Sequence, residues 1–197
     1  SPVGAIEIYS HTPGIYSLDN KPVKKYGTNG STPVITSVDY IYDTNYPTLI
    51  KSQSTQLSDG DTKTSQYKYA FDFTGSLVMR NLTLNHIISN PIEIVNKQNS
   101  QVTGAEVFKY NCFNCNFLPN DGGLLVNGVF AVSEFLKLKI DSPITNYQFA
   151  NSALSIDSRF ETLETFGKYD NRGNPLEVKK SNGPSLSYIM GYKKKYA

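Results

Sequence analysis

One recurring unit constrains the fold of this chain more than any other feature of its sequence. The unit begins with an asparagine-rich turn and continues through a proline into a short alternating strand. After a second turn it returns in a strand that ends in aromatic residues. The clearest copy covers residues 169–192, with Pro175 at its entry and turns at residues 170–173 and 181–183. Short recurring units are typical of structural arrays, in which each unit packs on its neighbours.

Three earlier segments follow the same layout, and their entry prolines are Pro22, Pro47 and Pro91. The expected turns are residues 28–30, 59–60 and 98–100, and the expected returning strands are residues 34–42, 62–69 and 105–110. Proline cannot donate to a β-ladder and is tolerated at the first residue of a strand. Asn-Gly and Asp-Gly pairs supply the positive φ that tight hairpins need. We therefore expect each unit to be a β-hairpin.

The aromatic composition supports the same conclusion. The 197 residues include 14 Tyr and 10 Phe but no Trp, and these rings favour pleated, half-buried surfaces. The returning strands end in aromatic residues two positions apart, as in Tyr40 and Tyr42 or Phe108 and Tyr110. Because residues two apart share a face of a strand, we expect an aromatic stripe across neighbouring strands.

The region between the second cysteine and Pro175 is less regular but still resembles strands. Asn127 and Gly128 separate two apolar runs, which predicts a hairpin between residues 124–126 and 129–132. Residues 136–140 alternate cleanly, and Phe149 and residues 160–166 suggest two more strands.

One segment predicts a helix instead, over residues 75–86. Apolar residues at 78, 79 and 82 have nearly helical spacing, and Thr74 or Ser76 can cap the N-terminus. A strand through Leu82 and Leu84 is the alternative. We predict a mainly β fold, an antiparallel meander of hairpins with one short helix near residues 75–86, forming a single segment over residues 1–197.

Charge and hydropathy exclude several classes of partner. The 19 basic and 17 acidic residues leave a net charge of +2, which gives no reason to expect nucleic acid. No run approaches the roughly 18–20 apolar residues that span a bilayer, so we expect no membrane span. The chain starts without methionine or a signal peptide. We expect it to be a fragment of a larger repeat protein.

The only two cysteines are Cys112 and Cys115. A redox pair and half of a zinc site are two interpretations, but zinc needs further ligands, and the only histidines, His11 and His86, are isolated. A redox pair favours a helix N-terminus, whereas this pair follows a strand-like run. The structural interpretation is favoured, either as reduced thiols or as a local disulfide in an extracellular setting.

The sequence offers no catalytic set. Histidine is the usual general acid or base, and neither His11 nor His86 has a partner group nearby in sequence. Residues 121–123 lack the Lys-Ser pair of a phosphate-binding loop. Glu161 and Glu164 are expected to be solvated strand residues. We predict a protein that is not an enzyme and that holds no cofactor and no metal.

Residues 168–178, followed by Gly183 and residues 187–192, resemble the YD repeat of Rhs proteins, in the variant common in Bacteroidetes surface proteins. A second Tyr-Asp pair at Tyr42 and Asp43 and the segments 71–73 and 90–94 are similar to that variant as well. The resemblance covers most of residues 20–192. Met190 departs from it, since a large aromatic residue is expected there.

The resemblance implies a strip of β-hairpins that coils, in full-length relatives, into a hollow shell around a C-terminal cargo. It also implies an extracellular or cell-surface location. The implied function is structural, and the implied partners are the rest of the polypeptide and other copies that pair through exposed sheet edges. A carbohydrate-binding or adhesive module that uses exposed tyrosines is the alternative. The candidate motif residues are Tyr42, Asp43, Pro47, Tyr67, Tyr69, Asn90, Pro91, Tyr110, Tyr169, Asp170, Gly173, Asn174, Pro175, Gly183, Tyr188 and Tyr192.

Overall fold

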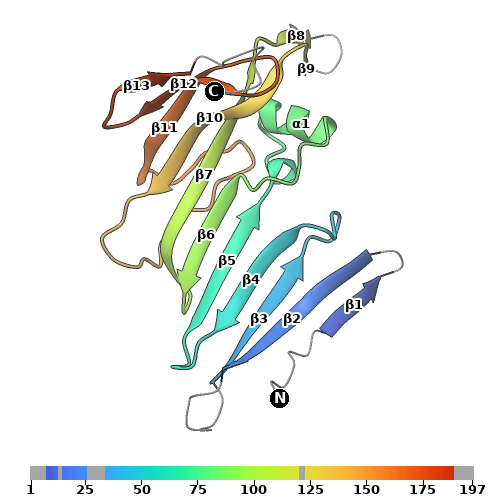
Figure 1. Ribbon diagram of the computed structural model, residues 1–197, viewed down its shortest axis with the longest axis vertical. Helices are drawn as coiled ribbons and strands as arrows, with labels where there is room; N and C mark the ends of the chain where they lie inside the picture. The colour runs from blue at the N-terminus through green and yellow to red at the C-terminus, as the bar shows by residue number, and fades with distance from the viewer. Residues whose placement is uncertain (1–7, 13–14, 26–33, 120–122, 189–197) are drawn as a thin grey trace. The chain divides into compact units, whose positions relative to one another are not determined.

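The computed structural model describes residues 8–12, 15–25, 34–119 and 123–188 (Figure 1). It is mainly β, with one large antiparallel sheet and a single short helix in the described residues, which confirms the predicted fold class. In the main sheet the strands pair in the order β1-β2-β3-β4-β5-β6-β7-β10-β11-β12-β13, and β8 pairs with β9 separately.

The strands are β1 (Ile8–Thr12), β2 (Ile15–Lys25), β3 (Val34–Tyr42), β4 (Ile50–Gln56), β5 (Thr62–Lys68), β6 (Glu93–Gln98), β7 (Gln101–Phe113), β8 (Asn116–Leu118), β9 (Leu124–Val126), β10 (Val129–Leu138), β11 (Phe160–Tyr169), β12 (Pro175–Lys180) and β13 (Ser185–Ser187). A 3₁₀-helix, η1 (Ala70–Asp72), and an α-helix, α1 (Leu77–Leu84), lie between β5 and β6 in the chain.

All four proline units form antiparallel neighbours, as β2–β3, β4–β5, β6–β7 and β12–β13. The strand entry predicted at Pro22 is wrong, because β2 begins at Ile15 and Pro22 lies inside it, beyond Asn20, where the described pairing with β1 ends. The backbone conformation of the turn residues favours the antiparallel pairing. Asn99 and Ser100 both have positive φ, 49° and 74°, as a two-residue type I′ turn requires, and Gly60 has a φ of 90°. The turn expected at residues 28–30 lies outside the described residues.

The chain divides into two compact units. The first contains residues 1–67, 94–104 and 142–145, and the second contains residues 68–93, 105–141 and 146–197. In the first unit, β2 to β5 pair consecutively, and Val102 is buried where its backbone exchanges two hydrogen bonds with Ile144, of 2.7 and 3.0 Å.

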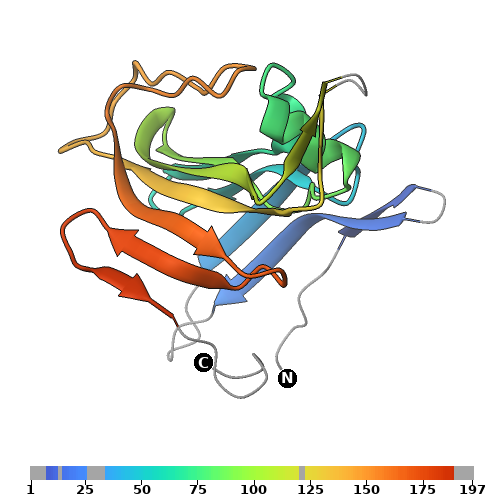
Figure 2. The same cartoon turned by 90° about the horizontal axis from the view of Figure 1, so that it is seen from above.

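The core of the second unit lies between its strands and α1. Figure 2 shows α1 and the irregular segment after β10 on the same side of β7 and β10. The buried core comprises Ala70, Phe73, Met79, Leu82, Ile92 and Ala150, with Tyr110 of β7 and Phe130 of β10 packed against it. Burial of this apolar surface is the main stabilising contribution available here.

The predicted helix is confirmed, and its cap is Ser76, whose Oγ accepts a 3.5 Å hydrogen bond from the Met79 N–H. The alternative strand through Leu82 and Leu84 is wrong. Met79 and Leu82 are buried, whereas Leu84 is 64% exposed, so one helical face points to the core.

The hairpin predicted at Asn127 and Gly128 is wrong. Asn127 does have a positive φ of 62°, but the turn leads from β9, which pairs with β8, into β10, which pairs with β7. Gly128 lies against the end of β7, where an added Cβ would be 2.4 Å from the Phe113 carbonyl oxygen. Glycine is therefore required here by close packing.

The strand predicted around Phe149 is also wrong, whereas the strands predicted over residues 136–140 and 160–166 are present as the end of β10 and as β11. Backbone N–H groups around Phe149 bond to side chains instead of to a neighbouring strand. Gln148 donates to the Asp157 carboxylate at 3.1 Å, and Ala150 donates to the Glu93 carboxylate at 3.0 Å. Side-chain acceptors thus replace a β-ladder in this segment.

Candidate functional site

The first Tyr-Asp pair forms a turn that is organised by a buried carboxylate. Tyr42 ends β3, and Asp43 follows with only 7% of its surface exposed. The Oδ1 atom of Asp43 accepts hydrogen bonds from the N–H groups of Asn45 (2.9 Å) and Tyr46 (3.0 Å). The Asp43 N–H donates to the Leu49 carbonyl at 2.9 Å, which closes the loop before β4.

The second Tyr-Asp pair is built in the same way. Tyr169 ends β11, and Asp170 is also 7% exposed. The Oδ1 atom of Asp170 accepts from the N–H groups of Arg172 (2.8 Å) and Asn174 (2.9 Å), while the Asp170 N–H donates to the Asn174 carbonyl at 3.0 Å. In both turns the carboxylate accepts a hydrogen bond from the N–H two residues later in the chain and a second one from a further N–H. This is the pattern of an Asx turn.

The turn predicted at residues 170–173 is confirmed. The Gly173 N–H donates to the Asp170 carbonyl at 3.2 Å, and Gly173 has a φ of 82°. A type I turn followed by a left-handed residue is a common three-residue hairpin connection. Pro175 then enters β12 opposite Tyr169.

The other motif residues occupy strand ends and turns. Pro47 lies in the Asp43 turn and Tyr67 in β5, while Pro91 precedes β6 and Gly183 lies between β12 and β13. Tyr69 is buried and donates its N–H to Asp72 at 2.8 Å, and Asn90 donates to the Tyr110 hydroxyl at 3.4 Å. Tyr188 follows β13 and is 41% exposed. Tyr192 lies outside the described residues.

The aromatic residues make local contacts. In the first unit, the rings of Tyr40 and Tyr42 lie 6.5 Å apart between centroids. In the second unit, Phe108 stacks on Phe135 of the neighbouring strand at 5.0 Å, and Tyr169 contacts Phe113 at 4.8 Å. The Tyr169 hydroxyl donates to the Val132 carbonyl at 2.7 Å. The hydroxyl group of Tyr169 thus links the end of β11 to β10.

A buried charged cluster in the second unit was not predicted from the sequence. Glu93, at the start of β6, is only 1% exposed, and its carboxylate lies 3.5 Å from the Lys68 Nζ. The Oε1 atom of Glu93 accepts from the Tyr147 hydroxyl at 2.6 Å and from the Ala150 N–H at 3.0 Å. Burial and the hydrogen bond to Glu93 raise the pKa of Tyr147 well above its ordinary value, so its hydroxyl keeps its proton.

A second ion pair fixes the same irregular segment. Asp157 is 4% exposed and accepts hydrogen bonds from the Arg159 side chain at 2.9 and 2.7 Å. Further N–H groups of Arg159 and Gln148 also donate to it. The Arg159 side-chain hydrogen bond is the main reason that the pKa of Asp157 is held well below its ordinary value.

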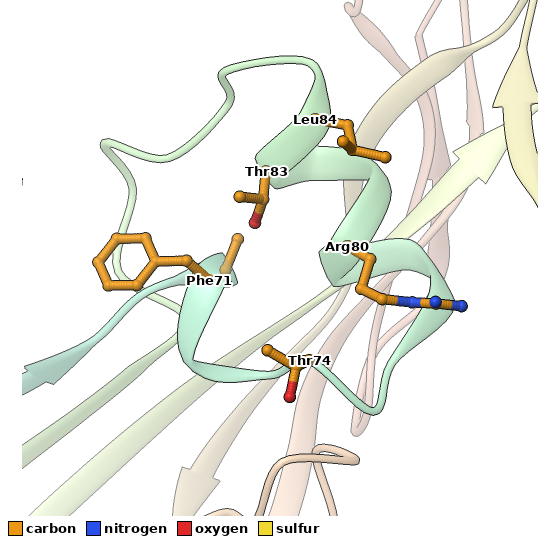
Figure 3. Close-up of a pocket in the computed structure, with 6 residues that line it drawn as sticks. Phe71, Thr74, Arg80, Thr83 and Leu84 are labelled. Carbon is orange, nitrogen blue, oxygen red and sulfur yellow. The ribbon is translucent and has the colours of Figure 1, made fainter. Parts of the chain in front are cut away.

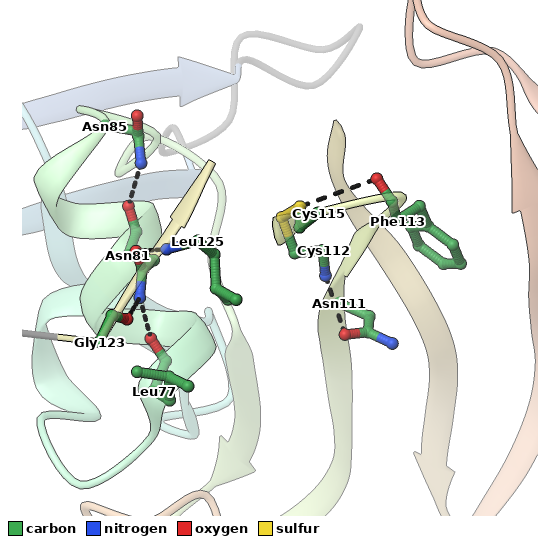
Figure 4. The surroundings of a disulfide bond; sticks show 9 residues. All are labelled: Leu77, Asn81, Asn85, Asn111, Cys112, Phe113, Cys115, Gly123 and Leu125. Carbon is green, nitrogen blue, oxygen red and sulfur yellow. Dashed lines mark hydrogen bonds between the residues drawn. A yellow bond between two sulfur atoms is a disulfide. The ribbon is translucent and has the colours of Figure 1, made fainter. Parts of the chain in front are cut away.

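The two cysteines form a disulfide, Cys112–Cys115, around the bend that ends β7 (Figure 4). Figure 4 also shows Asn81 of α1, which is 2% exposed. Its Oδ1 accepts from the Leu125 N–H at 2.9 Å, and its Nδ2 donates to the carbonyls of Leu77 (2.9 Å) and Gly123 (3.3 Å). Asn81 therefore joins α1 to β9, and nothing in its sequence context predicts this role.

Two surface pockets lie in the second unit. The pocket beside α1, of about 230 Å³, is lined by Ala70, Phe71, Thr74, Arg80, Thr83 and Leu84. Figure 3 shows Phe71 and Arg80 extending in opposite directions around it. A larger pocket of about 620 Å³ lies between the turn at Asn127 and the turn at Arg172. Binding sites combine apolar walls with a few polar groups. The smaller pocket is almost wholly apolar, whereas the lining of the larger one includes Asn85, Asn127 and Arg172.

The remaining candidate groups of the sequence analysis have ordinary surroundings. His86 is exposed and follows α1 with a φ of 58°. Glu161 lies 2.7 Å from the Lys139 Nζ, and Glu164 lies 3.9 Å from the Lys180 Nζ. Within the described residues, His, Cys, Asp and Glu side chains form no group of three that could hold a metal ion. No helix in the same residues is long and apolar enough to cross a membrane.

Comparison with known proteins gives no further identification. No family model, no curated protein and no solved structure matches the chain.

Proposed function

We propose that this chain is a non-catalytic structural repeat segment of a large secreted or cell-surface protein of the Rhs-like type, and that it scaffolds or encloses a C-terminal cargo. The observation that supports this most strongly is the shared hydrogen-bond pattern of Asp43 and Asp170. Each carboxylate is buried, and its Oδ1 atom accepts from the backbone of its own turn. The Oδ2 atom lies 3.8 Å from the Lys51 Nζ in Asp43 and accepts from the Asn174 side chain at 2.9 Å in Asp170. The motif thus builds hairpins and presents no free carboxylate to a substrate.

The end of the sheet also supports an array. Within the described chain, β13 pairs with β12 on one side and with no strand on the other. Leu186 and Tyr188 near this edge are 44% and 41% exposed. An open edge with exposed apolar side chains can accept a further strand, which a following repeat would supply.

The carbohydrate-binding alternative has weaker support, because it needs exposed tyrosines. Among the tyrosines whose side chains are described, only Tyr188 is exposed, at 41%; the others are half-buried or, in the case of Tyr69, buried. The hydroxyl of Tyr147 and that of Tyr169 bond inside the second unit. The positions of these tyrosines therefore favour a role in packing over a role in stacking on a sugar ring.

Cryo-electron microscopy of the full-length gene product tests the proposal. The expected result is a sheet that continues beyond β13 into further hairpins and surrounds a separate C-terminal region. A protein in which the sheet stops at β13, or in which a polar cleft holds a bound metabolite, would overturn it.

A further inference from the structure

The two carboxylate oxygens of Glu93 have different environments. Oε1 accepts two hydrogen bonds, from the Tyr147 hydroxyl and the Ala150 N–H. Oε2 is buried and makes no hydrogen bond in the structure, and the group beside it is the Lys68 Nζ at 3.5 Å. Most buried polar atoms have a hydrogen-bond partner, so an unpaired carboxylate oxygen needs a physical explanation.

Lys68 is held firmly at this position. Its Nζ donates to the Ala150 carbonyl at 2.7 Å, and its ammonium lies 5.1 Å from the Phe149 ring centroid and 5.9 Å from that of Phe73. The backbones are joined as well, since the Ile92 N–H donates to the Lys68 carbonyl at 2.7 Å. The amine, on a side chain that is 33% exposed, therefore meets the buried carboxyl group beside two aromatic rings.

We propose that Lys68 and Glu93 become joined by a side-chain amide bond, an intramolecular cross-link between the end of β5 and the start of β6. The inference concerns the second unit alone and does not depend on the proposed array function.

The reaction is a condensation that needs no further reagent. A proton passes from the Lys68 ammonium to Oε2, which leaves a neutral amine and a neutral carboxylic acid. The Nζ lone pair attacks Cδ, and Oε1 takes the negative charge of the tetrahedral intermediate. Nζ then releases a second proton to Oε2, the Cδ–Oε2 bond breaks, and Oε2 departs as water.

The contacts fit each step. The Tyr147 hydroxyl and the Ala150 N–H act as an oxyanion hole for Oε1, the oxygen that the amide keeps. Oε2 lacks such donors and faces the amine, so it is the oxygen that leaves. Holding both groups in place removes most of the entropic cost of a bimolecular condensation.

Intact mass spectrometry of the purified, fully reduced protein tests this inference. The expected mass is lower than the sequence mass by one water molecule, and tandem spectra place residues 68 and 93 in one branched peptide. The variants Lys68→Met and Glu93→Ala are expected to regain the full sequence mass.

Lys109→Met is the matched control, because Lys109 forms a 3.0 Å ion pair with Glu134 outside this cluster, and it is expected to retain the loss of water.

The variant Tyr147→Phe removes one donor to Oε1 and is expected to leave a mixture of linked and unlinked chains. A wild-type protein at its full sequence mass would overturn the proposal. A water loss that maps to a cyclic imide at an aspartate would overturn it too. Because the cross-link is mapped directly in the wild-type protein, the test remains valid even if a variant fails to fold.

Discussion

At the scale of single residues, the buried carboxylates in this protein organise the backbone around them. Asp43 and Asp170 each accept two N–H groups of their own turn, and Asp157 accepts those of Gln148 and Arg159. A buried N–H without a partner is costly, so each carboxylate stabilises a turn that has no ladder of its own. The Asp-containing turns are therefore the points where single substitutions act most strongly.

The variant Asp170→Ala is expected to destabilise the protein by about 1–3 kcal/mol, because it leaves the N–H groups of Arg172 and Asn174 without their acceptor. Urea unfolding at neutral pH measures this change. Asn171→Ala in the same turn is the control, since Asn171 is exposed, and it is expected to change stability by less than ~0.5 kcal/mol. Equal effects of the two variants would show that the Asp170 carboxylate does not organise the turn.

The lowered pKa of Asp157 gives a pH-dependent stability. A carboxyl group whose pKa is lower in the folded state stabilises that state above its unfolded pKa of about 3.9, and the contribution is lost as the pH falls through the folded value. The stability difference between the wild type and Asp157→Asn should therefore be largest near neutral pH and shrink in acid. Unfolding titrations from pH 7 down to pH 3 measure it. Asp141→Asn, at an exposed position, is the control, and a difference that stays constant with pH would contradict the account.

At the scale of elements, α1 is the one α-helix in the described chain. It contributes apolar side chains to the core and a polar side chain that bonds to a neighbouring strand. Met79 and Leu82 enter the apolar core, while Asn81 holds the backbone of β9. Helices of this length are marginal alone, so packing and these hydrogen bonds must supply most of the stability of α1.

Leu82→Ala is expected to cost about 2–5 kcal/mol, because it opens a cavity in a fully buried cluster. Leu84→Ala removes the same atoms from a side chain that is 64% exposed and is expected to cost less than ~0.5 kcal/mol. Thermal and urea unfolding of both variants measure the difference. Similar losses of stability at the two positions would show that the buried face of α1 has been assigned to the wrong side of the helix.

The hairpins and the helix could be predicted from sequence because local residues determine them. Pro175 marks the entry of β12, Asn-Ser and Asp-Gly pairs give turns, and Ser76 gives the helix cap, whereas Pro22 lies inside β2. The pairing of β9 with β8 could not be predicted, because it depends on contacts with α1, 40 or more residues away in sequence. The Lys68–Glu93–Tyr147 cluster was missed for the same reason, since its members come from three separate segments.

At the scale of the whole molecule, the central claim is that the chain is a stretch of structural hairpin repeats. Both Tyr-Asp turns bury their carboxylates, and the described sheet ends in a partly apolar edge at β13. The buried cluster around Glu93 lies under the segment that contains Tyr147 and Ala150, so it too serves to hold the fold together.

The most direct test of this claim is the cryo-electron microscopy structure of the full-length gene product, examined at the outer edge of β13. The account predicts a further antiparallel strand paired with β13, leading into hairpins closed by the same Asp-centred turn. An edge of β13 that remains open to solvent, with no further hairpin repeats in the protein, would contradict it.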